Sequence, residues 1–286
     1  MKLGIMAASS QLGTKTVEAL LARGVDEGDV VAIARTPSKM EDLIAQGVET
    51  RAGDYDDRVS MERAFEGIDR LLLVPTLAMP VERVPQIENA VAAARAAGVT
   101  HLLEYGLVPT TLESKFAITP YYLYAESLLR HCGLAWTSLR NSMYADPIAE
   151  WVPEIVKMGT IPYPTGDGAC AFVTRDDIAR TGAAALSTDG HEGKTYNLTG
   201  PKAYTTAELC EVVARVTGEL VEYRPATDQD YVDACVREGI PAEFAWVLLT
   251  IYHDVRDGRF ALVSDDIEKL TGQAALSFEE YLESGV

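Results

Sequence analysis

The stretch Ile5-Met6-Ala7-Ala8-Ser9-Ser10-Gln11-Leu12-Gly13 decides the fold of this chain. It combines the end of an apolar strand with a turn of small residues, and residues 14–23 then predict a helix. This order is typical of the first unit of a dinucleotide-binding fold. Three glycines usually provide the tight turn, the close approach of a pyrophosphate and the helix–strand packing. Those positions hold Ala7, Ser10 and Gly13 here, so one glycine of three remains.

The altered loop has two interpretations. In the first, the N-terminus of the following helix still holds a pyrophosphate, because its free N–H groups and its dipole favour an anion. The Ser10 side chain would then either crowd the phosphate or donate a hydrogen bond to it. Replacing glycine by Ala7 would cost little stability if the φ of residue 7 is negative and more if it is positive. In the second, the loop only packs. The candidate cofactor-binding residues of this loop are Ala7, Ser9, Ser10, Gln11, Leu12 and Gly13.

The first 140 residues alternate between short apolar runs and amphipathic segments. Regular alternation with short loops predicts an α/β fold of the Rossmann type, a doubly wound parallel sheet with helices on both faces. Gly98 is expected to end the long fourth helix in a left-handed conformation. The predicted strands cover 2–6, 30–34, 49–52, 71–75, 101–104 and 136–140, and the predicted helices cover 14–23, 38–46, 58–65, 81–97 and 122–131.

The pattern changes after Asn141. Prolines and glycines predict a loop-rich stretch, followed by a strand at 171–173 and a helix at 177–186 with Thr174 or Asp176 as its cap. A further strand is expected at 194–197. Thr205 and Glu208 form a capping-box pattern that opens a helix to Thr217. We therefore expect an NAD(P)-binding domain at 1–145 and a small α/β C-terminal lobe at 146–286, with elements that return to the sheet.

Composition restricts the partners. The 286 residues carry 43 acidic and 25 basic side chains, a net charge of −18, which disfavours nucleic acid and anionic membrane surfaces as partners. The four cysteines and four histidines are scattered, without the spacing of a metal site or a disulfide framework, so no metal is expected. No apolar run approaches the length of a membrane span, and no signal peptide is recognisable, so we expect a cytoplasmic protein.

Several ordered patterns over residues 1–217 resemble the atypical short-chain dehydrogenase/reductases of the NmrA-like group. The resemblance is closest to the branch of NAD(P)H:quinone oxidoreductase type 2 and triphenylmethane reductase. It implies an oxidoreductase, a monomer or homodimer, that moves hydride from NADPH to a small planar aromatic substrate such as a quinone. The patterns are the loop at 7–13, Gly53-Asp54-Tyr55-Asp56-Asp57, Gln86 and Asn89 with Ala92–Val99, Leu139–Tyr144, Gly166-Asp167-Gly168, Phe172–Ala179 and Tyr196–Pro201.

The strand ends supply further candidates for the cofactor. Arg35 follows the second strand, where an acid would bind the ribose of NAD and an arginine suits the 2′-phosphate of NADP. Lys39 adds a second positive charge, so NADP(H) is favoured over NAD(H). A solvated arginine at a helix entrance is the alternative. The resemblance places Asp54 and Tyr55 beside the adenine, and Pro75 and Thr76 near the ribose and the nicotinamide.

The catalytic residues are harder to assign. The standard enzymes of this class use Tyr-x-x-x-Lys, in which the lysine lowers the pKa of the tyrosine. No lysine lies four residues after Tyr121, Tyr122 or Tyr124. Quinone reduction demands less of the protein, because water can protonate the phenolate that forms. The candidates are Tyr122 as a proton donor, Tyr105 as a replacement for the usual serine, and Asn141 and Tyr144 as contacts of nicotinamide or substrate.

The leading prediction is thus an NADPH-dependent reductase of the NmrA-like type with a quinone or a similar planar acceptor. Two alternatives remain open at this point. The altered loop and the missing lysine also fit a non-catalytic protein that senses NAD(P) and regulates a partner. They fit equally a family member whose loop is empty and whose lobe binds another small molecule.

Overall fold

A computed structural model describes residues 1–76 and 78–285. Its centre is a seven-stranded sheet in the order β3-β2-β1-β4-β5-β6-β9, in which every neighbouring pair is parallel. The order reverses between β1 and β4, where a doubly wound sheet leaves a crevice at the carboxyl ends of its strands. The strands are β1 Leu3–Met6, β2 Val30–Ala34, β3 Glu49–Ala52, β4 Arg70–Leu73, β5 His101–Leu107, β6 Ala135–Asn141 and β9 Lys194–Leu198.

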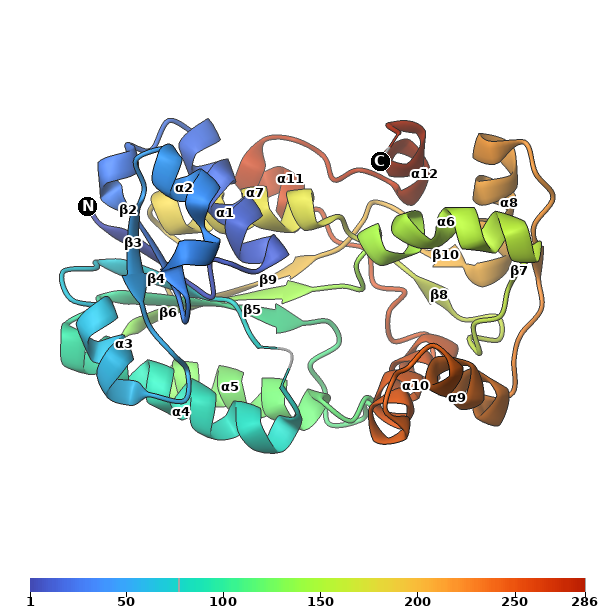
Figure 1. The fold of residues 1–286 in the computed structure, drawn as a ribbon, viewed down its shortest axis with the longest axis horizontal. Coiled ribbons are helices and arrows are strands. Elements are labelled where there is room, and N and C mark those ends of the chain that lie inside the picture. The colour runs from blue at the N-terminus through green and yellow to red at the C-terminus, as the bar shows by residue number, and fades with distance from the viewer. Residues whose placement is uncertain (77, 286) are drawn as a thin grey trace.

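Helices cover both faces of the sheet (Figure 1). One face carries α1 Gln11–Ala22, α7 Arg175–Ser187 and α11 Asp266–Thr271. The other carries α3 Arg58–Ala64, α4 Pro80–Ala97 and α5 Thr119–His131. The strands β1, β2 and β4 are fully buried, as continuous apolar runs in a parallel sheet require. The predicted α/β fold is therefore confirmed, and Gly98 ends α4 with φ +80° as expected.

The connections around β2 are short. The 3₁₀ turns Glu27–Asp29 and Pro37–Lys39 flank β2, and α2 Glu41–Ala45 lies between β2 and β3. The expected helix 38–46 is thus split in two, because Met40 at φ −111° interrupts the helical backbone. The expected strand 101–104 continues to Leu107 and pairs along its full length with β6.

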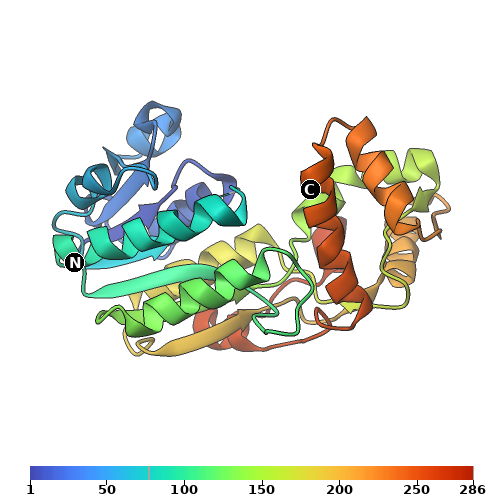
Figure 2. The same ribbon diagram turned by 90° about the horizontal axis from the view of Figure 1, so that it is seen from below.

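A lobe with its own apolar core stands beyond the carboxyl ends of the strands (Figure 2). Its small sheets pair β8 with β10 antiparallel and β7 with β11 parallel. The elements α7, β9 and α11 leave this half of the chain and return to the main sheet. The lobe consists of α6 Asp146–Met158, β7 Thr160–Ile161, β8 Ala169–Cys170, β10 Tyr204–Thr205, α8 Thr206–Thr217, β11 Glu222–Tyr223, α9 Asp228–Arg237, α10 Ala242–Arg256 and α12 Phe278–Glu283.

Two expectations for this half were wrong. The stretch after Asn141 is not mainly loop, because α6 fills 146–158 with Pro147 in its first turn, where a missing N–H costs nothing. Burial of the apolar face of α6 offsets the loss of helix stability that the internal Pro153 causes. The predicted strand 171–173 is also absent: the described strand ends at Cys170, and Val173 forms only an isolated bridge with Tyr144.

The caps explain where the helices of the second half begin. Thr174, one of the two expected caps, accepts a hydrogen bond from the N–H of Asp177. The capping box of Thr205 and Glu208 is confirmed at the start of α8. No helix among residues 1–76 and 78–285 is both long and apolar enough to cross a membrane. Nor do those residues bring three potential metal-ligating acids, histidines or cysteines together.

Candidate cofactor site

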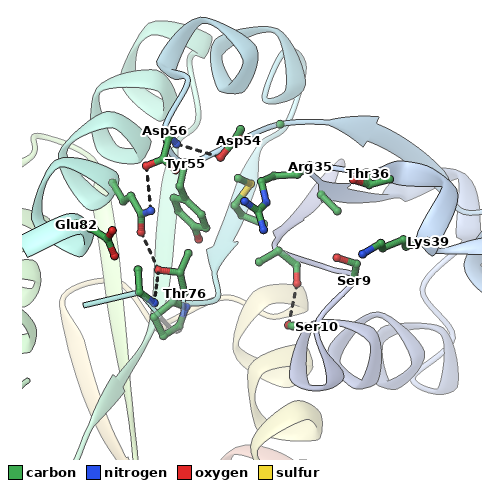
Figure 3. Close-up of a pocket in the computed structure, with 17 residues that line it drawn as sticks. Ser9, Ser10, Arg35, Thr36, Lys39, Asp54, Tyr55, Asp56, Thr76 and Glu82 are labelled. Carbon is green, nitrogen blue, oxygen red and sulfur yellow. Dashed lines mark hydrogen bonds between the residues drawn. The ribbon is translucent and has the colours of Figure 1, made fainter. Parts of the chain in front are cut away.

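A pocket of about 590 Å³ opens at the carboxyl ends of β1 to β4 (Figure 3). Its volume is in the usual range for a small-molecule or cofactor site. Loop residues after each strand line it, which is why candidates far apart in the sequence meet there. The lining comprises Met6, Ala7, Ser9, Ser10, Ala34, Arg35, Thr36, Lys39, Gly53, Asp54, Tyr55, Asp56, Pro75, Thr76, Ala78, Glu82 and Gln86.

The loop after β1 keeps a glycine-type backbone without its first glycine. Ala7 has a φ of +58°, and it is the single non-glycine with a positive φ among the described residues. This left-handed conformation costs an alanine about 1 kcal/mol. Gly13 shows why the third glycine remains: a Cβ there would lie 2.4 Å from the carbonyl oxygen of Ala7 and 2.8 Å from the Cα of Ala8.

Ser10 acts first as the cap of α1. Its Oγ accepts the N–H of Gly13 at 3.1 Å and donates to the carbonyl oxygen of Ala7 at 2.8 Å. Helix α1 therefore starts at Gln11, three residues before the predicted start. A helix of this kind leaves the N–H groups of its first turn without intrahelical acceptors, and they are suited to an anion. Gln11, Leu12 and Gly13 are not among the residues that line the pocket, so any contact of theirs would be through backbone N–H groups.

Two cations follow β2. The side chains of Arg35 and Lys39 are exposed and extend into the pocket from this strand end (Figure 3). Neither forms an ion pair with a carboxylate of the described part of the chain, although the protein carries a net charge of −18. An unpaired cation pair at this position fits the 2′-phosphate of NADP.

The wall opposite is built from the ends of β3 and β4. The ring of Tyr55 faces the pocket, and its hydroxyl donates to the carbonyl oxygen of Val74 at 2.8 Å. Gln86 links the two strand ends: its amide donates to Asp56 at 3.0 Å, and its carbonyl accepts from Thr76 at 2.7 Å (Figure 3). Asp54, Pro75 and Thr76 also line the pocket. This hydrogen-bonded wall holds Tyr55 and Thr76 in place.

Part of this lining is not predicted from the sequence. Gln86 and Glu82 come from the first turns of α4, and nothing in the sequence alone indicated that these turns border the pocket. In the sequence Gln86 stands out only as part of the fourth-helix pattern of the resemblance, whereas its burial, with 8% exposed, is a fact of the structure. Glu82 also forms part of a capping box, in which its carboxylate accepts the N–H of Met79.

A narrow recess of about 10 Å³ continues from the pocket between β4, β5 and α5. Tyr55, Pro75, Thr76 and Gln86 border both spaces. Glu104 lies in the wall of the recess, 3% exposed, and its Oε1 has no hydrogen-bond partner among the described residues. Burial, with a contribution from the nearby Glu126, raises the pKa of Glu104 to about 8. Its carboxyl group is therefore mainly neutral at pH 7.

The geometry argues against the expected role of the Tyr105 hydroxyl. Tyr105 is 1% exposed, and its Oη lies 2.9 Å from the Oγ1 of Thr16 under α1. A Cβ at Gly182 of α7 would lie 2.0 Å from the same oxygen. The residue borders the recess, but its hydroxyl is enclosed by α1 and α7 on the other side of the sheet. Burial raises the pKa of this phenol well above its ordinary value.

The other three catalytic candidates lie beyond the large pocket, toward the lobe. Asn141 donates its amide to the Oη of Tyr144 at 3.4 Å, while its buried Oδ1 has no partner in the described part of the chain. Burial raises the pKa of Tyr144 to about 12. Tyr122 on α5 is half-buried, and its Oη accepts a hydrogen bond from Arg83 at 3.3 Å. An amide oxygen left unpaired at the end of β6 is suited to an amide donor of a ligand.

The comparisons with known proteins agree with this geometry. A family model described as NAD(P)H-binding matches residues 7–189. Quinone oxidoreductase 2 of Escherichia coli is 31% identical over 97% of this chain and 96% of its own length. The solved structure of the E. coli NADPH-dependent quinone oxidoreductase with NADPH has a TM-score of 0.93 at 30% identity and covers 99% of each chain.

A second solved structure is equally similar. The triphenylmethane reductase of Citrobacter sp., complexed with NADP(H), has a TM-score of 0.93 and 31% identity, with 100% of both chains covered. Both solved structures contain the cofactor for which Arg35 and Lys39 are suited. The family model matches residues 7–189, and the related reductases match nearly the full length of the chain. This chain therefore belongs to the NAD(P)H-binding family, in its NmrA-like reductase group.

Proposed function

We propose that the protein is an NADPH-dependent reductase that transfers hydride to a quinone or a similar planar aromatic acceptor. The observation that carries this proposal is the pocket at the reversal point of the sheet, with its unpaired Arg35 and Lys39. The similarity of the whole chain to quinone and dye reductases supports the acceptor class.

Each part of the pocket has a role in this proposal. The first turn of α1 and the loop from Ala7 to Ser10 hold the pyrophosphate, and Arg35 with Lys39 holds the 2′-phosphate. Tyr55 and Asp54 frame the adenine. Thr76 and the end of β4 then direct the nicotinamide toward Asn141 and Tyr144. NADPH, when bound, supplies the hydride.

The two altered glycines are compatible with this role. Ala7 already has the conformation that a glycine would adopt, so the turn has its usual shape. The Ser10 side chain is held back by its bonds to Ala7 and Gly13, where it caps α1 and leaves space above the loop. The loop therefore differs from a three-glycine loop in residue type more than in geometry.

Turnover tests the proposal directly. Purified protein is mixed with NADPH and menadione, and the absorbance of NADPH is followed against a control without enzyme. We expect NADPH consumption that saturates with menadione. Saturable NADPH binding without turnover would instead support the sensor of NAD(P), and absence of any NADPH binding would support a lobe that binds another molecule.

The substitution Arg35→Asp tests the assigned cofactor. Because a carboxylate repels a 2′-phosphate and accepts a ribose hydroxyl, we expect the preference of NADPH over NADH to fall by at least about tenfold. Arg23→Asp is a matched control, since Arg23 is an exposed arginine at the end of α1 and does not line the pocket. The ratio of kcat/KM for the two cofactors is the measurement, and an unchanged ratio in Arg35→Asp would refute the assignment.

A further inference from the structure

Helix α4 carries a buried cation without an ionic partner. Arg83 is 6% exposed, and it forms no ion pair with any carboxylate of residues 1–76 and 78–285. Its Nε donates to the carbonyl oxygen of Ala78 at 2.6 Å, and its Nη1 donates to the Oη of Tyr122 at 3.3 Å. The guanidinium also lies 5.5 Å from the ring centroid of Tyr121. A buried charge is normally paired, so this arrangement points to an anion that arises or binds nearby.

The surroundings place this cation on the acceptor side of the cofactor pocket. Ala78, which Arg83 contacts, lines the pocket, and Tyr121 lines the recess that continues from it. Tyr122 is near enough to Tyr144 for its charge to raise the pKa of Tyr144. Arg83 therefore adjoins residues that line the pocket and its recess, and its partner Tyr122 lies near Tyr144, which follows β6.

Neighbouring acids leave the charge of Arg83 uncompensated at neutral pH. Glu104 affects the ionisation of both Tyr121 and Tyr122, but its own pKa of about 8 keeps it mainly protonated at pH 7. Glu82, the residue before Arg83 on α4, is exposed, and its carboxylate accepts the N–H of Met79. Burial raises the pKa of Tyr122 above its ordinary value, and Arg83 offsets only part of that rise. Arg83 therefore acts on Tyr122 in the same direction as the lysine of Tyr-x-x-x-Lys, but from another helix and without bringing the pKa below its ordinary value.

We propose that Arg83 and Tyr122 form the acceptor-selecting pair of this reductase: Arg83 favours acceptors that become oxyanions, and Tyr122 gives the oxyanion its proton. This inference rests on the proposed quinone reductase activity. It makes neutral quinones the preferred substrates of this chain and cationic triphenylmethane dyes poor ones, although relatives of both names are equally similar.

The chemistry distinguishes the two acceptor classes. A quinone that receives a hydride becomes a hydroquinone monoanion, and one proton on its oxygen completes the product. The O–H bond of Tyr122 breaks as the new O–H bond forms, Arg83 stabilises the tyrosinate, and water then returns a proton to Tyr122. A triphenylmethane dye is a carbocation: the hydride forms a C–H bond at its central carbon and gives a neutral product without any proton transfer.

The test compares menadione with a cationic dye in matched variants. For Tyr122→Phe, we expect kcat with menadione to fall by about 10- to 100-fold, near the lower limit for a lost general acid because water can also protonate a phenolate. The kcat with crystal violet is expected to stay within about twofold. Tyr124→Phe is the control, because Tyr124 is an exposed tyrosine on the same helix.

Arg83→Met should change kcat/KM for the two acceptors in opposite directions. We expect a fall of at least about tenfold in kcat/KM with menadione and a rise, or a newly measurable rate, with crystal violet, since a nearby cation repels the dye. Arg83→Lys should restore most of the menadione rate. Arg95→Met, an exposed arginine of the same helix, should change neither.

A binding measurement adds a readout that does not depend on turnover. With NADP⁺ bound, 4-nitrophenol titrated into the wild-type protein should bind as the yellow phenolate, about tenfold more tightly than to Arg83→Met. Equal losses with both acceptors, or equal phenolate binding by the two proteins, would overturn this inference alone. Absence of turnover with every acceptor in the wild-type protein would instead contradict the proposed function.

Discussion

Single residues decide whether the first loop keeps its shape. Ala7 occupies a left-handed conformation, with φ +58°, that glycine adopts more easily. Ala7→Gly should therefore stabilise the protein slightly, by up to about 0.5 kcal/mol, after the greater flexibility of glycine in the unfolded chain is included. The matched change Ala8→Gly, at a buried position without a positive φ, should destabilise it by about 0.5–1 kcal/mol. Urea unfolding measures both, and a loss of stability in Ala7→Gly would contradict the strain.

At the same scale, Glu104 makes stability depend on pH. Its pKa is about 8 in the folded protein and near the ordinary value of 4.5 when unfolded, so the folded state holds one more proton between these values. The free energy of unfolding from this group therefore falls as pH rises from about 4.5 to about 8, and it is constant above that range. Glu104→Gln should remove this slope. Thermal unfolding of both proteins from pH 5 to pH 8.5 tests it, and parallel curves would disprove a neutral Glu104.

Residue types also set the limit of what the sequence could predict about the site. The candidates after strand ends, such as Arg35, Tyr55 and Thr76, meet in the pocket because parallel strands end at one edge of the sheet. Tyr105 was equally well placed in the sequence. Its direction depends on the packing of Thr16 and Gly182, which come from two distant helices, and no local pattern contains that information.

At the scale of elements, the start of α1 depends on one cap. Ser10 accepts the N–H of Gly13, while Ser9 is exposed and makes no side-chain hydrogen bond in the described structure. Ser10→Ala should cost about 1 kcal/mol of stability, and Ser9→Ala should cost about a few tenths at most. The two variants are compared by chemical unfolding without cofactor. Equal costs would show that the cap does not hold this turn.

Elements of the first half could be predicted well because each apolar run is a buried strand and each helix has an ordinary start or stop signal. Helix α6 could not, since two prolines resemble loop signals. Its apolar positions Ile148, Val152 and Ile155 still follow helical spacing, and their burial in the lobe core outweighs the penalty of Pro153. The short strands β7, β8, β10 and β11 have two residues each, too few for any periodic signal.

At the scale of the whole molecule, a buried carboxylate joins the lobe to the nucleotide-binding half. Asp254 on α10 is fully buried and accepts the backbone N–H groups of Lys115 and Phe116 at 2.7 and 3.2 Å, and the Ser114 hydroxyl. These residues lie between β5 and α5. The anchor therefore fixes the lobe relative to α5, which carries Tyr122.

Asp254→Asn should destabilise this connection by at least about 2 kcal/mol. The asparagine NH₂ group would replace one carboxylate oxygen and face a backbone N–H that needs an acceptor. Asp257→Asn, one turn along and more exposed, should cost about 1 kcal/mol or less. Hydrogen exchange of the 114–116 amides is the measurement. Similar protection in both variants would mean that Asp254 does not hold the lobe.

The proposed reductase activity depends on whether the altered loop binds the cofactor. Calorimetric titration of the wild-type protein with NADPH, and separately with NADH, tests this most directly. We predict saturable binding of one NADPH per chain, at least about tenfold tighter than NADH because Arg35 and Lys39 meet the 2′-phosphate. No heat of binding with either cofactor, or equal affinity for both, would contradict it.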